Sequence, residues 1–357
     1  TRKESSAASD VYKRQVQLLP GQGETVGAQL TGDDRVRGVM FTGSTEVATL
    51  LQRNIASRLD AQGRPIPLIA ETGGMNAMIV DSSALTEQVV IDVLASAFDS
   101  AGQRCSALRV LCLQDEIADH TLKMLRGAMA ECRMGNPGRL TTDIGPVIDS
   151  EAKANIERHI QTMRSKGRPV FQAVRENSED AREWQSGTFV APTLIELDDF
   201  AELQKEVFGP VLHVVRYNRN QLPELIEQIN ASGYGLTLGV HTRIDETIAQ
   251  VTGSAHVGNL YVNRNMVGAV VGVQPFGGEG LSGTGPKAGG PLYLYRLLAN
   301  RPESALAVTL ARQDAEYPVD VQLKAALTQP LNALREWAAN RPELQALCTQ
   351  YLSLIHI

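Results

Sequence analysis

Residues 66–80 read Ile-Pro-Leu-Ile-Ala-Glu-Thr-Gly-Gly-Met-Asn-Ala-Met-Ile-Val, two apolar runs around a polar turn. Short apolar runs bounded by turn signals are typical of buried strands. We therefore predict one strand over 66–70, which ends directly at Glu71, and a second over 76–80. Two consecutive glycines, Gly73 and Gly74, indicate that the backbone between the strands passes close to another group.

A helix is predicted after the second strand. Its apolar side chains recur on roughly one face, at Leu85, Val89, Val93, Phe98 and Ala101. Asp81, Ser82 or Ser83 is a suitable N-cap, and Gly102 fits the end of the helix. This strand–turn–strand–helix unit is the first sign of an α/β fold.

The same alternation continues on both sides of this unit. Upstream we predict a strand over 36–41, a tight turn at 43–45, and a helix with Ser44 as N-cap and apolar residues at Val47, Leu51, Ile55 and Leu59. Downstream we predict strands over 110–113, 189–197, 211–217, 237–241 and 257–262, and helices over 116–133, 150–165, 222–231 and 244–252. Such alternation favours an α/β fold with mostly parallel sheets. Residues 277–290 are glycine-rich and predicted to be loop, and the chain after 297 reads as helical.

Composition narrows the class of protein. The chain has 357 residues, of which 43% are hydrophobic and 21% charged, which is typical of a soluble globular protein. A formal charge of -6 argues against a nucleic-acid surface. The apolar runs are too short to cross a bilayer, and no secretory signal opens the chain, so we expect a cytoplasmic protein without membrane association. The six His and four Cys residues are scattered, and no metal site is predicted.

Cys105 and Glu71 are the candidate catalytic residues. The thiol of Cys105 stands in Gly102-Gln103-Arg104-Cys105-Ser106, polar and flexible neighbours that an ordinary buried cysteine lacks. A thiol can hold an aldehyde carbon, first as a thiohemiacetal and then as a thioester, and a carboxylate can activate the water that releases the acid. The dipole at a helix C-terminus does not lower a thiol pKa, so activation has to come from Arg104, the base or a cofactor cation.

Two further segments allow more than one interpretation. The turn Phe41-Thr42-Gly43-Ser44-Thr45-Glu46 suits a phosphate at a helix N-terminus, but an ordinary capped turn has the same pattern. The segment 206–210 is favoured as a plain turn on spacing alone. The sequence Gly21-Gln22-Gly23 does not match the dinucleotide fingerprint.

Five motifs, taken in order, resemble the signatures of the NAD(P)-dependent aldehyde dehydrogenases. They are Phe41-Thr42-Gly43-Ser44, Glu71-Thr72-Gly73-Gly74, Gly102-Gln103-Arg104-Cys105, Glu206-Val207-Phe208-Gly209-Pro210 and Pro275-Phe276-Gly277-Gly278. Residues 258–264 and 285–291 are similar to the glutamate-semialdehyde (1-pyrroline-5-carboxylate) branch. The segment from Pro302 onward resembles the proline utilisation A family of bacterial bifunctional flavoenzymes, and this resemblance covers about 16–352.

The resemblance implies a role for each motif. Cys105 is the nucleophile and Glu71 the base for thioester hydrolysis. The cofactor NAD is held by Thr42, Gly43, Ser44, Glu206 and Phe208. The substrate is held by Ser106, Gly268, Ala269 and Phe276.

The resemblance also implies a domain plan. It gives a partial Rossmann-type NAD-binding domain (16–72), a catalytic domain (73–276), a glycine-rich return and oligomerisation segment (277–296) and a helical C-terminal extension (297–352). Residues 1–15 are polar and lack periodicity, and residues 353–357 break the preceding pattern, so we expect a disordered or non-native tail at 1–15 and a non-native tail at 353–357. The oxyanion Asn and the adenosine-binding Lys of the family belong upstream of Phe41, outside this chain. The chain is thus expected to be an internal piece of a longer protein.

Three functional hypotheses follow. The first is NAD-dependent oxidation of L-glutamate γ-semialdehyde to L-glutamate, with FAD bound only in the proline dehydrogenase domain of the parent and a homo-oligomeric parent. The second is a truncated scaffold that binds NAD poorly. The third is an aldehyde dehydrogenase for another substrate.

Overall fold

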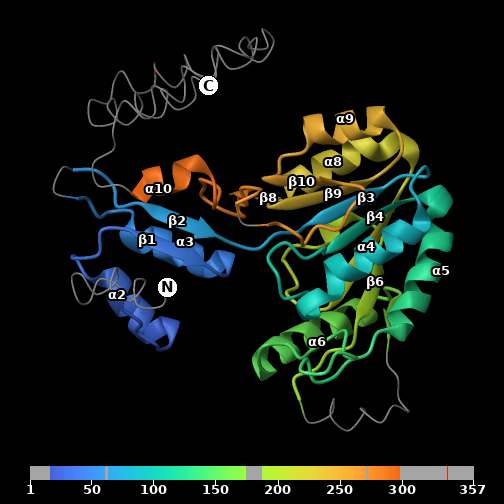
Figure 1. Cartoon of the computed structure of the whole chain (residues 1–357), viewed down its shortest axis with the longest axis horizontal. Helices are drawn as coiled ribbons and strands as arrows, with labels where there is room; N and C mark the ends of the chain where they lie inside the picture. The colour runs from blue at the N-terminus through green and yellow to red at the C-terminus, as the bar shows by residue number, and fades with distance from the viewer. Residues whose placement is uncertain (1–16, 61–62, 174–186, 271, 298–335, 337–357) are drawn as a thin grey trace, which may run out of the picture. The chain divides into compact units, whose positions relative to one another are not determined.

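The computed structural model describes residues 17–60, 63–173, 187–270, 272–297 and 336. Its contacts divide the chain into the unit Thr1–Leu297 and the unit Leu298–Ile357. The predicted tails 1–15 and 353–357 lie outside the described residues, as does nearly all of the predicted extension 297–352. The following account concerns the first unit (Figure 1).

Seven strands form the main sheet: β3 (Ala77–Val80), β4 (Val110–Gln114), β5 (Val170–Gln172), β6 (Thr193–Leu197), β7 (Val211–Tyr217), β9 (Thr237–His241) and β10 (Asn259–Val262). Their order is β10-β9-β3-β4-β7-β6-β5. Among these described strands, only β5 pairs antiparallel, with β6. Because β3 and β4 are flanked on both edges and covered on both faces, every residue in them is buried, as expected of central parallel strands. The predicted α/β fold with a mostly parallel sheet is confirmed.

Five helices accompany this sheet: α4 (Thr86–Phe98), α5 (Asp115–Glu131), α6 (Ser150–Ser165), α8 (Leu222–Ala231) and α9 (Asp245–Ser254). Figure 1 shows α8 and α9 beside β9 and β10. The predicted bounds of α6, α8, β7 and β9 agree with the structure. The predicted strand over 189–197 begins only at Thr193, where pairing with β7 starts.

Two smaller sheets complete the unit. Strand β1 (Val39–Thr42) pairs parallel with β2 (Leu68–Glu71), and α3 (Thr45–Ile55) follows β1. Short strands β8 (Tyr234–Gly235) and β11 (Glu279–Gly280) pair antiparallel, so the predicted loop over 277–290 contains one short strand. The remaining described helices are α2 (Ala28–Gly32) and α10 (Pro291–Leu297), with short π and 3-10 turns at Gly23–Gly27, Asp99–Gly102, Phe200–Glu202 and Arg219–Gln221.

Helix α4 differs from its prediction at both ends. Its N-cap is Leu85, whose aliphatic side chain cannot cap the helix. The Asp81 carboxylate accepts from the N–H and hydroxyl of Ser83 in the turn before the helix. The helix ends at Phe98, earlier than the predicted Gly102. A left-handed run with φ of 55° at Ser100, 53° at Ala101 and 65° at Gly102 then reverses the chain. The predicted caps and the predicted end of this helix were therefore wrong, although the prediction of Ser44 as N-cap of α3 is confirmed.

Candidate active site

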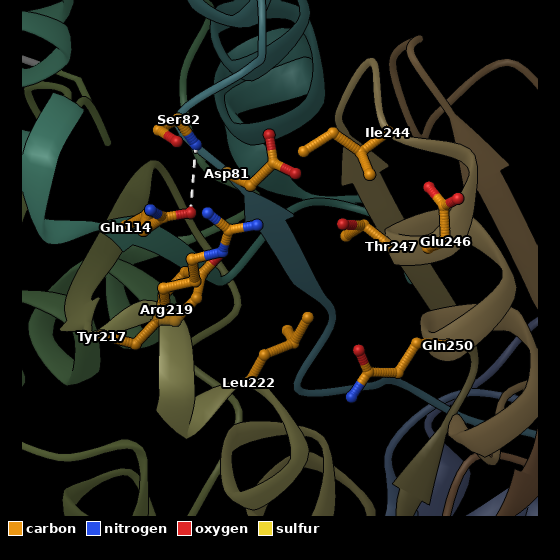
Figure 2. Close-up of a pocket in the computed structure, with 10 residues that line it drawn as sticks. All are labelled: Asp81, Ser82, Gln114, Tyr217, Arg219, Leu222, Ile244, Glu246, Thr247 and Gln250. Atoms are coloured by element: carbon orange, nitrogen blue, oxygen red, sulfur yellow. Dashed lines mark hydrogen bonds between the residues drawn. The ribbon is translucent and has the colours of Figure 1, made fainter.

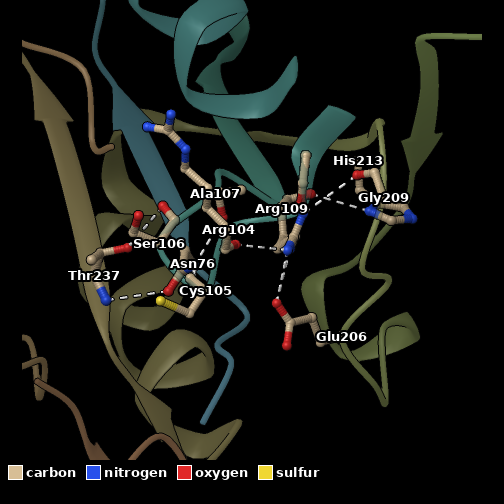
Figure 3. A network of polar contacts seen from close by, with 11 residues as sticks. Asn76, Arg104, Cys105, Ser106, Ala107, Arg109, Glu206, Gly209, His213 and Thr237 are labelled. Atoms are coloured by element: carbon tan, nitrogen blue, oxygen red, sulfur yellow. Dashed lines mark hydrogen bonds and ion pairs between the residues drawn. The ribbon is translucent and has the colours of Figure 1, made fainter. Parts of the chain in front are cut away.

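The loop that carries Cys105 is held at the amino ends of three neighbouring strands. The side-chain amide of Asn76 donates to the carbonyl oxygens of Cys105 at 2.7 Å and Ala107 at 2.8 Å. Its own carbonyl oxygen accepts from the Thr237 N–H at 3.2 Å. One buried amide thus ties the starts of β3, β4 and β9 to the backbone at Cys105 (Figure 3).

Arg109 is the second residue that organises this loop, and its side chain is only 1% exposed. Its guanidinium donates to the carbonyl oxygens of Gly102 at 2.7 Å and Arg104 at 3.1 Å, and to the Glu206 carboxylate at 2.9 Å. Sequence reasoning missed both Asn76 and Arg109. The available signal was an arginine set among the apolar residues 107–113, since a buried charge is found inside proteins only when it is paired.

Glu206 lies between Arg109 and the Gly73-Gly74 turn. A Cβ atom at Gly73 would stand 1.7 Å from Oε2 of Glu206, which only glycine avoids. The close approach predicted from the two glycines is therefore confirmed. Burial raises the pKa of the Glu206 carboxyl, while Arg109 and the Gly74 N–H oppose that rise. The ring of Phe208 is 45% exposed and lies 5.0 Å from the Arg109 guanidinium carbon.

Glu71 ends β2 in a crowded, poorly solvated position. Its Oε2 accepts from the Gly278 N–H at 3.4 Å, and its buried Oε1 has no hydrogen-bond partner in the structure. A Cβ atom at Gly277 would lie 3.0 Å from Oε1. Burial raises the pKa of Glu71 to about 7, the range in which a carboxylate serves best as a general base at neutral pH.

The Cys105 thiol shares its surroundings with both carboxylates. Burial raises its pKa, and the charges of Glu206 and Glu71 raise it further, whereas the N–H groups of Ser106 and Cys105 lower it. The Arg104 guanidinium, one of the predicted sources of activation, donates instead to the Ser100 hydroxyl at 3.1 Å and the Val267 carbonyl at 3.3 Å. The thiol and the two carboxylates thus form one electrostatically coupled cluster.

The predicted cofactor turn adjoins the Glu71 strand. Thr42 pairs with Glu71 in the two-stranded sheet, and the Gly43 N–H donates to the Glu71 carbonyl at 3.1 Å. The Ser44 hydroxyl caps α3 by accepting from the Val47 N–H at 3.2 Å. The turn therefore presents a helix N-terminus next to the strand that ends at the candidate base.

The predicted substrate residues come from separate segments. Ser106 is 8% exposed and follows the thiol directly. Gly268 is half-buried beside the Arg264 guanidinium, and Ala269 is exposed. Because Arg104 binds the carbonyl of Val267, the 267–269 loop is tied to the Cys105 loop. Phe276 is half-buried and exchanges two backbone hydrogen bonds with Ala288, at 2.9 Å and 2.8 Å.

Two cavities lie beside the main sheet in the part of the chain that the structure describes. One of about 630 Å³ borders Glu206, Phe208, Gln103 and helix α6. The other, of about 190 Å³, lies where β3, β4 and β7 end and includes Asp81, Gln114 and Tyr217 (Figure 2). Only the first adjoins the cluster around Cys105. Among the residues that the structure describes, no group of three or more His, Cys, Asp or Glu is placed to hold a metal ion, and no helix is long and apolar enough to cross a membrane.

Comparison with known proteins agrees with this geometry. The model of the aldehyde dehydrogenase family matches residues 6–299. The chain is 99% identical to the bifunctional protein PutA of Escherichia coli K12 over 94% of its own length and 26% of that protein. It is 35% identical to a 1-pyrroline-5-carboxylate dehydrogenase of Geobacillus kaustophilus, covering 77% of this chain and 52% of that one. The chain thus spans about a quarter of the length of its PutA relatives.

Solved structures give the same result. A crystal structure of a bifunctional proline utilisation A protein matches with a TM-score of 0.75 and 50% identity, covering 82% of this chain and 29% of that one. A 1-pyrroline-5-carboxylate dehydrogenase from Thermus with bound NAD matches with a TM-score of 0.70 and 36% identity, covering 78% of this chain and 52% of that one. This chain is therefore a member of the aldehyde dehydrogenase family, homologous to its 1-pyrroline-5-carboxylate dehydrogenases.

Proposed function

We propose that this chain carries the thiol site for NAD-dependent oxidation of L-glutamate γ-semialdehyde to L-glutamate, the second step of proline catabolism. The observation that carries the proposal is the anchored Cys105 peptide, whose flanking carbonyls accept from the buried side chains of Asn76 and Arg109, together with the buried Oε1 of Glu71, which has no hydrogen-bond partner in the structure. The names of the relatives support the substrate, since several are 1-pyrroline-5-carboxylate dehydrogenases.

Cys105 is the nucleophile of the proposed reaction. Its thiolate attacks the aldehyde carbon, and the C=O π bond becomes the oxyanion of the thiohemiacetal. NAD, when bound, supplies the acceptor for the hydride that leaves this carbon, and Cys105 is left as a thioester. Glu71 then takes a proton from water, whose oxygen attacks the thioester carbon and breaks the C–S bond. L-Glutamate leaves and the Cys105 thiolate is regenerated, so the aldehyde is oxidised by two electrons.

Thr42, Gly43, Ser44, Glu206 and Phe208 suit the proposed cofactor. The capped N-terminus of α3 offers backbone N–H groups to a phosphate. A Cβ atom at Gly43 would lie 2.4 Å from the Phe41 ring, so glycine lets this ring pack over the turn. The cavity that borders Glu206 and Phe208 gives room for part of a ligand next to these two side chains.

Ser106, Gly268, Ala269 and Phe276 are the proposed substrate contacts. A Ser hydroxyl and backbone N–H groups from a Gly-Ala loop can bind a carboxylate without a buried cation. The link between Arg104 and the Val267 carbonyl supports this assignment, because it holds the loop near the thiol. A preference for acetaldehyde over succinate semialdehyde and glutamate semialdehyde would contradict it and favour an aldehyde dehydrogenase for an uncharged substrate.

The direct test is NADH absorbance with glutamate semialdehyde, measured on the full-length Escherichia coli protein to which the chain is 99% identical. We expect turnover in the wild type and none in Cys105→Ala. Cys132→Ala is the matched control, since Cys132 is a half-buried thiol at the end of α5. Undiminished turnover in Cys105→Ala would refute the nucleophile assignment.

A second candidate function is a scaffold that retains the Cys105 site but binds NAD poorly. The small core of the two-stranded sheet favours it, since among the described residues its buried cluster consists of Ile55, Leu68 and Ala70. Calorimetric titration of the 357-residue chain with NAD separates the two candidates. Micromolar binding would eliminate the scaffold.

The properties of the longer parent protein are also proposals. The chain spans about a quarter of its PutA relatives, so FAD is assigned to the proline dehydrogenase part of the parent and not to this chain. We infer a cytoplasmic, homo-oligomeric parent with a small-molecule aldehyde as substrate. Size-exclusion chromatography with light scattering on the full-length protein tests the oligomer.

A further inference from the structure

Every N–H group of the Arg109 guanidinium is directed at an acceptor of the candidate active site. Nε and Nη2 donate to Oε1 of Glu206 at 3.1 Å and 2.9 Å. Nη1 donates to the carbonyls of Gly102 at 2.7 Å and Gly209 at 3.4 Å, and Nη2 also donates to that of Arg104 at 3.1 Å. A guanidinium has five such donors in a rigid fork. All five therefore hold backbone or side chain from the Cys105 and Glu206 loops (Figure 3).

These contacts fix the peptide in front of the nucleophile. The carbonyl of Arg104 belongs to the same planar peptide as the N–H of Cys105, so holding the carbonyl also sets the direction of that N–H. The carbonyl of Cys105 is held independently by Asn76 at 2.7 Å. Both peptides that flank the Cα atom of Cys105 are thereby anchored to buried side chains.

The backbone of Arg109 is itself anchored. Its N–H donates to the Asn76 carbonyl at 2.9 Å. Its carbonyl accepts from the backbone N–H of His213 at 2.9 Å and lies 3.1 Å from Nδ1 of the same histidine. Because the Arg109 backbone is held at both its N–H and its carbonyl, the guanidinium holds the loops that it binds in a defined position.

We propose that Arg109 is a positioning residue, which sets the Cys105 peptide and holds the Glu206 carboxylate in one cluster with it. The inference rests on the proposed function, in which Cys105 is the nucleophile and Glu206 faces the cofactor. Arg109 then has two tasks. It orients N–H groups that stabilise the Cys105 thiolate, and it fixes the position of the thiol relative to the Glu206 carboxylate. Misplacement of a reacting group by about 1 Å costs about 100-fold in rate.

The test starts from Glu206→Gln, because Arg109→Met alone would leave a buried carboxylate unpaired and destabilise the protein. Arg109→Met is added to this background in the 357-residue chain, and the rate of Cys105 alkylation by iodoacetamide is followed against pH by peptide mass spectrometry. We expect the midpoint of the alkylation profile to rise by about one pH unit or more, since an opposite charge near the thiolate is lost. Arg126→Met in the same background is the control, because Arg126 pairs with Glu196, outside this cluster.

An unchanged midpoint in a variant that melts like its background overturns the proposal. If Arg109→Met does not fold, Arg109→Lys in the wild-type background decides. Lysine keeps the charge but cannot hold the three carbonyls, so we expect kcat to fall about 100-fold with KM for NAD within about threefold in the full-length protein. A wild-type kcat in Arg109→Lys overturns the proposal. The alkylation readout needs no turnover, so failure of the proposed dehydrogenase activity is recognised separately.

Discussion

The seven-stranded sheet and the two-stranded sheet hold candidate functional groups on buried cores of different size. The larger sheet contains a continuous buried core that runs from Met75 to Met266. The smaller sheet and α3 share a buried cluster of only three described residues, and they leave Met40, Val47 and Leu50 exposed by 55%, 42% and 56%. The thiol thus rests on a rigid scaffold, whereas the candidate cofactor turn rests on two strands, an assembly that is marginal by itself. Substitutions at four positions, Gly102, Asn76, Glu71 and Ser44, test this contrast, and several have matched variants elsewhere in the chain.

The largest effect is expected for Gly102→Ala in the loop of the larger sheet. Gly102 has φ of 65°, and an added Cβ would lie 2.1 Å from the Gly209 carbonyl oxygen, so a backbone atom has to move. We expect a loss of about 3 kcal/mol or more in unfolding free energy, measured by urea denaturation. Gly43→Ala in the smaller sheet meets only the Phe41 ring, which can rotate, and a cost of about 1 kcal/mol is expected. Equal costs would contradict the contrast.

Gly127→Ala provides the matched control for these two variants. Gly127 is exposed within α5, and an added Cβ would meet nothing within 4 Å. We expect this variant to gain about 0.5–1 kcal/mol, because alanine loses less conformational entropy in a helix.

The next largest effect is expected for Asn76→Ala. The change leaves the carbonyls of Cys105 and Ala107 and the N–H of Thr237 without their partner. Unsatisfied buried groups cost about 1–3 kcal/mol each, so a loss of about 3 kcal/mol is expected in thermal unfolding. Asn230→Ala, which removes two contacts near the surface, is expected to cost about 1 kcal/mol. A small effect at Asn76 would show that the Cys105 loop does not depend on this amide.

Glu71, at the junction of the two sheets, gives a pH test. Its pKa rises from 4.5 to about 7 in the folded chain because of burial. The stability that the protonated group contributes is present below pH 4.5 and is lost as the pH rises through about 7. We expect Glu71→Gln to be more stable than the wild type at pH 8 by about 1 kcal/mol, because solvent screens part of the effect at this half-buried carboxyl group.

The same titration predicts the kinetics of the proposed reaction. Thioester hydrolysis, followed by rapid-quench measurement in the full-length protein, is expected to speed up as the pH passes through about 7. In Glu71→Gln this rise is expected to disappear. A rise that persists in the variant would remove Glu71 from the role of base.

A small loss of stability is expected for Ser44→Ala. The change removes the cap of α3 and costs about 1 kcal/mol. Asp149→Ala removes the comparable cap of α6 in the larger unit, where Asp149 accepts from the Ala152 N–H at 2.7 Å. Backbone hydrogen exchange measures the opening of α3 and of α6 in the same experiment. We expect opening to spread through α3 after Ser44→Ala and to stay within the first turn of α6 after Asp149→Ala.

Local patterns located most elements of the larger sheet. The apolar runs over 211–217 and 237–241 become β7 and β9, and the amphipathic stretch over 150–165 becomes α6. Periodicity fails where the chain leaves regular structure: α4 ends at Phe98, since the left-handed run over 100–102 depends on the close approach of Gly102 to Gly209. That approach joins residues far apart in the chain and has no local signature.

The sequence by itself determined the fold class, the candidate nucleophile Cys105 and the candidate base Glu71, because alternation of apolar runs and short motifs are local properties. Only the tertiary structure decided what surrounds them. Arg109 and Glu206 are 97 positions apart, yet they form one buried pair beside the thiol. The pKa of Glu71 rises because segments from the far end of the chain exclude water from its carboxylate. Solvent exclusion and charge pairing depend on what packs around a group, which residue type and spacing do not record.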